Sequence, residues 1–415
     1  MSAVELNQKI DVWRVGKAKK SSQWRGRLAS FGFAILIVFP LLHYFELANY
    51  YDRTSSERGR LYSLTGVLGF LTIALMLILT KFENPFKHSS VAFYFIIAML
   101  GIAFLGSITS LQPMFSLAYS ILLIAVVLSM AYLRGIFENS SQGHLAIAAW
   151  VTALIVVSLF FYHDVDFPRR VGGIQPNELA KAAIVSMVLA FLSGSKYRFL
   201  FFIFAASVTL FAASRGGVSI LVIFSIIYLF QRRPLIISIL TLFFAGVLGT
   251  ISWIFISTFT PDIARLFLED ILALEHSSRA VVGTGFTGRT DHWMVGANLF
   301  SDGSFWRLFL GYGIGTRESV QVEDLRYVNA HQGYLNLLLD VGLLGAASFI
   351  FAVFFSIRDY FKRSFIYNDG RYAAAAGAFC VAYLIVMFLD PIYFRLGTPF
   401  SSLFIYLVVT SGIRN

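Results

Sequence analysis

The sequence predicts an all-α polytopic membrane protein with about twelve transmembrane helices and one long outer loop. The chain has 415 residues, of which 57% are hydrophobic and only 13% are charged. Apolar segments of about 17–25 residues recur along it, each long enough to cross roughly 30 Å of hydrocarbon. Because lipid offers no partner for backbone polar groups, we expect these segments to be helices.

The predicted domain organisation follows from the positions of these segments. Residues 1–27 are polar and basic and lack the cleavage site of a signal peptide, so we expect a cytoplasmic tail. Residues 28–258 would hold transmembrane helices 1–9, residues 259–332 an outer loop with a surface helix, and residues 333–415 helices 10–12. The predicted spans lie near residues 28–48, 61–80, 90–108, 114–133, 144–163, 178–195, 197–213, 216–231, 234–258, 333–357, 372–390 and 396–412.

The distribution of charge agrees with this topology and argues against nucleic acid as a partner. The net charge of +10 comes from basic residues scattered between the apolar segments, as the positive-inside rule predicts. The predicted outer loops carry arginine but no lysine. Because a guanidinium fork suits phosphate, this bias favours an outward-facing site for a phosphorylated ligand. Arginines that snorkel to the membrane interface are the alternative interpretation.

The segment Ser214-Arg215-Gly216-Gly217 interrupts two apolar runs that leave no room for a polar loop. Arg215 should therefore lie close to membrane depth, where an unpartnered arginine costs roughly 2.5–3.5 kcal/mol. The two glycines would let backbone amides at the start of the next helix approach a phosphate. The alternative is an interfacial arginine beside glycines that serve helix packing.

The long outer loop offers two further candidate arginines and a predicted helix. Arg289, in GRTDHW, stands at the start of that helix, which Thr290 would cap and which would lie on the membrane surface. Arg279, in SSRA, is an auxiliary candidate. The glycines of GYGIG, residues 311–315, predict a turn after the helix.

His331 begins the segment HQGYLNLLLDVGLLG, at the outer boundary of a predicted span. A histidine at a polar boundary titrates near neutrality and can take a proton from a hydroxyl nucleophile. A histidine that merely lies at the interface is the simpler alternative. Asp340 falls on the opposite face of the same predicted helix, so no Asp-His dyad is expected within it.

The remaining titratable residues predict neither a metal site nor a cofactor. Cys380 is the only cysteine and falls inside an apolar span, which excludes a cysteine metal site. The segment YHDVDF, residues 162–167, clusters a histidine and two aspartates without a metal-ligand spacing. Glu178 and Lys181 lie on one helical turn and are expected to pair at the membrane edge.

Four segments taken in order resemble the O-antigen ligase and polymerase superfamily: SRGG, GRTDHWMVGANLF, LFLGYGIGT and NAHQGYLNLLLDVGLLG. The resemblance covers residues 176–345 in motif form, and the remainder only through the number of spans. The histidine block matches best, although Gln332 stands where that superfamily frequently has asparagine. Its members are polytopic glycosyltransferases of the GT-C class of helical fold, and they work at the periplasmic face on glycans carried by undecaprenyl diphosphate.

The resemblance implies a metal-independent, inverting glycosyltransferase of the bacterial inner (plasma) membrane, with its active site facing the periplasm. Arg215 and Arg289, with Arg279 as an auxiliary, would bind the diphosphate, and His331 would activate the acceptor hydroxyl. The expected partners are the undecaprenyl-diphosphate-linked glycan, membrane lipid, an acceptor and a chain-length regulator.

Three functions stay open from the sequence. A polymerase would transfer the growing glycan to a second lipid-linked repeat unit, whereas a ligase would transfer it to lipid A core. The histidine block favours the polymerase. A transporter or flippase for a lipid-linked sugar belongs to another class, and it should show related halves and ionisable residues for ion coupling. The single long outer loop favours a fixed one-sided site instead.

Overall fold

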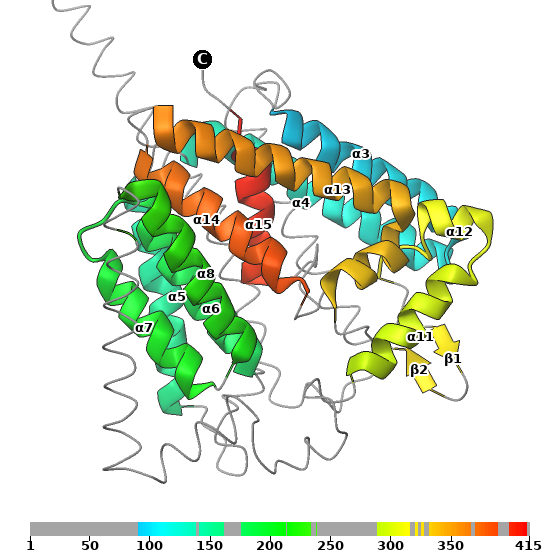
Figure 1. Cartoon of the computed structure of the whole chain (residues 1–415), viewed down its shortest axis with the longest axis horizontal. Coiled ribbons are helices and arrows are strands. Elements are labelled where there is room, and N and C mark those ends of the chain that lie inside the picture. Colours follow the sequence, from blue (N-terminus) through cyan, green and yellow to red (C-terminus); the bar gives the residue numbers. More distant parts are fainter. Residues whose placement is uncertain are drawn as a thin grey trace, which may run out of the picture.

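The computed structural model shows a helical bundle (Figure 1). The described residues between 289 and 327 form a small layer beside the bundle, which we call the outer layer. It describes residues 90–137, 141–161, 176–212, 214–233, 238, 289–315, 320–322, 325–327, 332–366, 370–388 and 398–412. In chain order, these residues form α3 (Val91–Gly106), η2 (Ser107–Thr109), α4 (Pro113–Phe137), α5 (Ser141–Phe161), α6 (Pro176–Leu192), α7 (Arg198–Phe211), α8 (Arg215–Arg232), α11 (Arg289–Ser301), α12 (Phe305–Leu310), β1 (Val320–Val322), β2 (Leu325–Tyr327), α13 (Gly333–Ile366), α14 (Gly370–Val386) and α15 (Pro399–Thr410).

The prediction of a helical membrane protein is confirmed in the described part of the chain. Every predicted span within that part falls on a helix. The predicted spans near 28–48, 61–80 and 234–258 lie outside it. The segments that are long and apolar enough to cross a bilayer are Val91–Thr109, Pro113–Ala131, Gln142–Leu159 and Gly333–Phe365.

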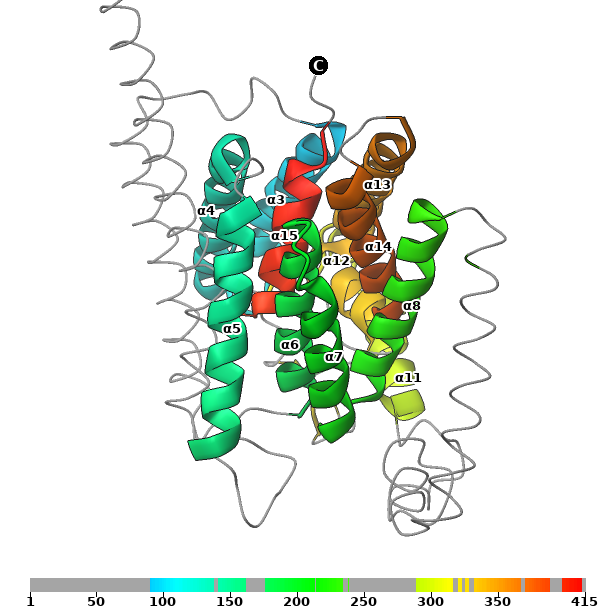
Figure 2. The same cartoon turned by 90° about the vertical axis from the view of Figure 1, so that its left-hand side faces the viewer.

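Helix α6 is the central helix of the bundle. All its residues from Leu179 to Leu192 are buried, and it contacts α5, α7, α8, α14 and α15. Figure 2 shows α5, α7 and α8 gathered around it. A helix covered on every side has no polar face to present, which explains the nearly continuous apolar run between Ala182 and Leu192.

The long helix α13 is kinked, a feature that the continuous apolar run did not predict. Gly342 adopts φ +65°, where an L side chain is strained, and splits α13 into two helical segments. A Cβ at Gly342 would overlap the backbone of Phe309 at the end of α12, and one at Gly311 would overlap the backbone of Asp340. The amide of Tyr312 donates to the carbonyl oxygen of Leu339 (2.7 Å). The segment after α12 therefore docks backbone to backbone on the kink.

The turn and the helix predicted within residues 259–332 are both found, with one correction; the membrane-surface position of the helix stays a prediction. Gly311, Gly313 and Gly315 all have positive φ, which confirms the turn. The helix is α11, but it begins at Arg289, so Thr290 lies within its first turn and does not cap it. One face of α11 packs on the cluster of Tyr312 and Leu339. The hairpin β1–β2, which pairs Val320 with Tyr327, was not predicted.

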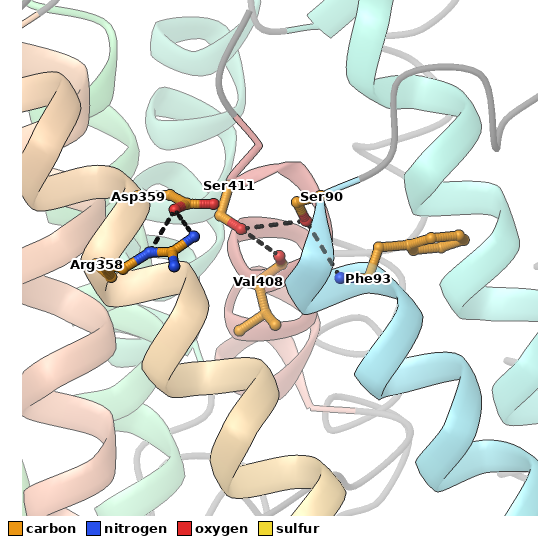
Figure 3. Close-up of polar contacts among 6 residues, drawn as sticks. All are labelled: Ser90, Phe93, Arg358, Asp359, Val408 and Ser411. Atoms are coloured by element: carbon orange, nitrogen blue, oxygen red, sulfur yellow. Dashed lines mark hydrogen bonds and ion pairs between the residues drawn. The ribbon is translucent and has the colours of Figure 1, made fainter.

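At the opposite end of the bundle, α3, α13 and α15 come together (Figure 3). Ser90 caps α3 and accepts a hydrogen bond from the hydroxyl of Ser411, which follows α15 (3.4 Å). Nearby on α13, the guanidinium of Arg358 pairs with the carboxylate of Asp359 (2.8 Å). The bond between Ser411 and Ser90 joins the first and last described helices far from α11.

Candidate functional site

The starts of α6, α8 and α13 lie at one end of the bundle, which we call the site end. Helices α8 and α14 run antiparallel, because Gly370 at the start of α14 lies against Arg232 at the end of α8. The other end of α14 therefore lies toward the start of α8. There the amide of Gly333, the first residue of α13, donates to the carbonyl oxygen of Met387 (2.7 Å).

Arg215 is the first residue of α8, directly after its cap. The hydroxyl of Ser214 accepts from the amide of Gly217 (3.1 Å), and the carbonyl of Ser214 accepts from Val218 (2.9 Å). The first amides of a helix point out of its end and give it a partial positive charge, which favours anions. Arg215 is described by its backbone alone, and that backbone is placed at this positive end.

Gly217 serves helix packing, which was the alternative reading of the two glycines. A Cβ at this position would lie 2.7 Å from Cγ2 of Thr209 on α7 and 3.0 Å from Cβ of Ala180 on α6. Its amide is also used by Ser214. The backbone of Gly217 therefore faces neighbouring helices. A phosphate that approaches the start of α8 would meet the amides of Arg215 and Gly216 instead.

Glu178 and Lys181 form an ion pair on the first turns of α6, as predicted. The Nζ of Lys181 lies 2.9 Å from Oε1 of Glu178, and the two side chains are 8% and 18% exposed. The lysine side chain is therefore the more enclosed of the two. Because Ala180 touches Gly217, the turn of α6 that carries the pair packs beside the first turn of α8.

Arg289 is the first residue of α11, and its placement too is known from the backbone alone. Val295 and Leu299 of α11 pack with Leu335 of α13 around a shared cluster. Figures 1 and 2 place α11 at the level of the lower ends of α6 and α8. The structure thus brings the helix that begins with Arg289 to the first segment of α13.

His331 and Arg279 lie outside the described residues. The described chain that follows, from Gly333, is anchored to the end of α14. The hydroxyl of Tyr334 donates to the carbonyl oxygen of Leu384 (2.8 Å), in addition to the bond from Gly333 to Met387. Asp340 is wholly buried beside the kink. It is the eighth residue of α13 and lies outside the first turn.

Tyr312 joins the outer layer to the bundle. Its hydroxyl donates to the carbonyl oxygen of Leu299 at the end of α11 (2.6 Å), and the guanidinium of Arg307 lies 5.1 Å from its ring centre. Burial raises the pKa of the Tyr312 hydroxyl; the positive charge of Arg307 opposes this and the negative charge of Asp302 adds to it. The tyrosine therefore stays neutral and keeps donating through the physiological pH range.

Among the described residues, no three His, Cys, Asp or Glu side chains gather to hold a metal ion. The candidate cluster in YHDVDF lies outside those residues. Cys380 is buried within α14.

Comparison with known proteins gives no family assignment: no protein-family model and no curated protein matches the chain.

Sequence reasoning missed two features of the site end. It treated the Glu178–Lys181 pair as peripheral, although a lysine inside an otherwise apolar run was a usable signal. It also gave no role to Tyr334, whose partner lies on another helix and left no local pattern. Chemically, the site end combines helix starts that favour anions, a buried ammonium and an anchored segment that follows a histidine.

Proposed function

We propose that the chain is an integral-membrane glycosyltransferase that transfers a glycan from an undecaprenyl-diphosphate-linked donor to a sugar hydroxyl. The acceptor is a second lipid-linked repeat unit, so the reaction polymerises O-antigen or exopolysaccharide. In this proposal about twelve helices of a GT-C-like fold cross the bacterial inner membrane. Both chain ends are cytoplasmic and the site end faces the periplasm.

The observation that carries the proposal is the position of Arg215 and the segment after His331 at the same end of the bundle. Arg215 and this segment are far apart in the sequence, and their helices are brought together by the packing of α14 against both α8 and α13 and by direct contact between α8 and α13. A lipid-linked diphosphate needs cations at the membrane boundary, because its tail stays in lipid while its head is charged. A general base must then lie within reach of the same boundary.

The proposed reaction is a single displacement. Arg215 and Arg289, with Arg279, bind the diphosphate and stabilise the charge that develops as it leaves. His331 accepts the proton of the acceptor hydroxyl while its oxygen attacks the anomeric carbon. The new glycosidic bond forms as the bond from that carbon to the diphosphate oxygen breaks. The configuration inverts, and undecaprenyl diphosphate leaves with the bonding electron pair.

Reconstitution of the purified protein with undecaprenyl-diphosphate-linked repeat units alone tests the proposal. A ladder of glycan lengths on a gel is the result expected for a polymerase. A shift that appears only when lipid A core is added would identify a ligase. Movement of the lipid-linked glycan across the bilayer without any chemical conversion would identify a transporter and overturn the proposal.

A matched set of variants tests the assigned residues. Arg215→Ala should weaken donor binding and His331→Ala should abolish transfer with donor binding retained, because the first binds the donor and the second activates the acceptor. Arg233→Ala is the control, since Arg233 is an exposed arginine at the other end of α8. Donor binding that is equal in Arg215→Ala and Arg233→Ala would remove Arg215 from the site.

A further inference from the structure

The ion pair of Glu178 and Lys181 is the one charged element in the described core of α6. Only Ser186 joins Lys181 as a polar residue among the buried residues of this helix. The lysine is the more enclosed partner, with 8% of its side chain exposed against 18% for the glutamate. The ammonium therefore lies inside the bundle, and the carboxylate lies nearer to the rim of the site end.

Stability of the fold does not explain this pair. Moving two charges into a low-dielectric interior carries a desolvation penalty that can exceed the free energy gained from their attraction. Replacing such a pair with apolar residues is often neutral or stabilising. Ionisable residues inside a membrane bundle mark binding or transport sites by default. Since α6 is already covered by helices on every side, an apolar pair of residues would serve its packing equally well.

The pair lies beside the start of α8. Ala180 directly precedes Lys181 and approaches Gly217, which is bonded to the Ser214 cap that precedes Arg215. The turn of α6 that carries the buried lysine and the positive end of a helix that begins with an arginine thus lie side by side. Both features favour the same kind of ligand, a multiply charged anion at the membrane boundary.

We propose that Lys181 binds phosphate oxygens of the lipid-linked substrate, together with the start of α8. Glu178 is its counter-ion: the carboxylate neutralises the ammonium until the diphosphate takes over that pairing. This inference rests on the proposed function and deepens it, because it adds a cation from a third helix to the diphosphate site. It also assigns Glu178 a role opposed to that of Lys181, since the carboxylate competes with the substrate.

Binding of undecaprenyl diphosphate to the full-length protein in lipid nanodiscs tests the assignment. Lys181→Met should weaken binding at least about tenfold, Lys181→Arg should weaken it less, and Glu178→Gln should bind as tightly as the unaltered protein or more tightly. Lys196→Met is the matched control, because Lys196 is exposed beyond the other end of α6 and stacks on Tyr197. It should bind as the unaltered protein does.

An exchanged pair separates binding from folding. The double variant Glu178→Lys with Lys181→Glu keeps one positive and one negative charge on the same turn, so a purely structural pair would be restored. Under the proposal this variant melts near the unaltered protein yet binds as weakly as Lys181→Met. Unaltered affinity in the double variant or in Lys181→Met would overturn the role of Lys181. Equal weakening by Glu178→Gln and Lys181→Met would overturn the role of Glu178.

The same assay distinguishes this inference from the proposed function. If the unaltered protein neither binds undecaprenyl diphosphate nor transfers glycan, the proposed function fails. If it does both and Lys181→Met retains full affinity, only the inference fails. Inorganic diphosphate serves as a second probe, and binding as tight as that of the lipid-linked form would overturn the lipid as the substrate class.

Discussion

The hydroxyl of Tyr334 donates a 2.8 Å hydrogen bond to the backbone carbonyl of Leu384, across 50 residues of sequence. Beside it, the amide of Gly333 bonds to the carbonyl of Met387. The two bonds hold the first turn of α13 against the end of α14. His331 stands two residues before Gly333 in the sequence, so the anchored turn is the described part of the chain that follows it most closely.

Tyr334→Phe should therefore lower the rate of transfer about tenfold while destabilising the fold by only about 1 kcal/mol. Under the proposed reaction, a displaced His331 accepts the proton of the acceptor hydroxyl poorly even when the protein stays folded. We expect kcat to fall with little change in KM for the donor. Tyr360→Phe is the control, because the hydroxyl of Tyr360 makes a similar bond to the carbonyl of Leu407 (2.7 Å) away from the site end. Equal losses of activity in both variants would make Tyr334 merely structural.

Gly342→Ala should destabilise the protein. The backbone conformation alone costs an alanine about 1–3 kcal/mol, and the added Cβ would also overlap the backbone of α12. The melting temperature in detergent should fall clearly below that of the unaltered protein. Gly101→Ala in α3 is the matched control, because a Cβ there has no neighbour within 4 Å. A Gly342 variant as stable as the Gly101 variant would contradict the kink.

Docking of the outer layer should weaken at alkaline pH through Tyr312. Its folded pKa is raised above 10.0, so folding favours the protonated hydroxyl that donates to Leu299. This stabilisation is complete below pH 10.0 and is lost as the pH rises through the raised value. Tyr312→Phe lacks the bond at every pH. The gap in melting temperature between the unaltered protein and this variant should therefore narrow as the pH rises above 10.0. A gap that stays constant through this range would contradict the link between folding and the protonation of the Tyr312 hydroxyl.

Labelling of single cysteines can test the topology. Cys380 is the only cysteine and is fully buried, so Cys380→Ala supplies a background without a thiol. Met294→Cys on α11 and Arg233→Cys after α8 then place exposed thiols at opposite ends of the bundle. A membrane-impermeant maleimide added to intact cells with a permeable outer membrane should label the first and spare the second. The reverse pattern would place the site end in the cytoplasm.

Much of the fold could be predicted from hydropathy because each span carries its own signal. The helices from α3 to α8 and from α13 to α15 lie where long apolar runs occur in the sequence, since lipid forces such runs into helices. The start of α11 at Arg289 and the glycine turn after α12 could also be predicted from local sequence patterns. Arg215 could be placed at a helix start for the same reason, because SRGG separates two apolar runs.

The remaining features depend on partners that are distant in the sequence. Nothing in the run Leu338 to Leu344 predicts a kink, because Gly342 is strained only once α12 packs against it. The apolar run around Lys181 was a signal of burial, but the sequence could not show which helices cover it, because they come from both halves of the chain. The sequence alone determined the membrane class and the helix positions, because burial in lipid depends on local composition. Tertiary structure alone decided that Arg215, Lys181 and the start of α13 share one end of the bundle, because proximity arises from helix packing.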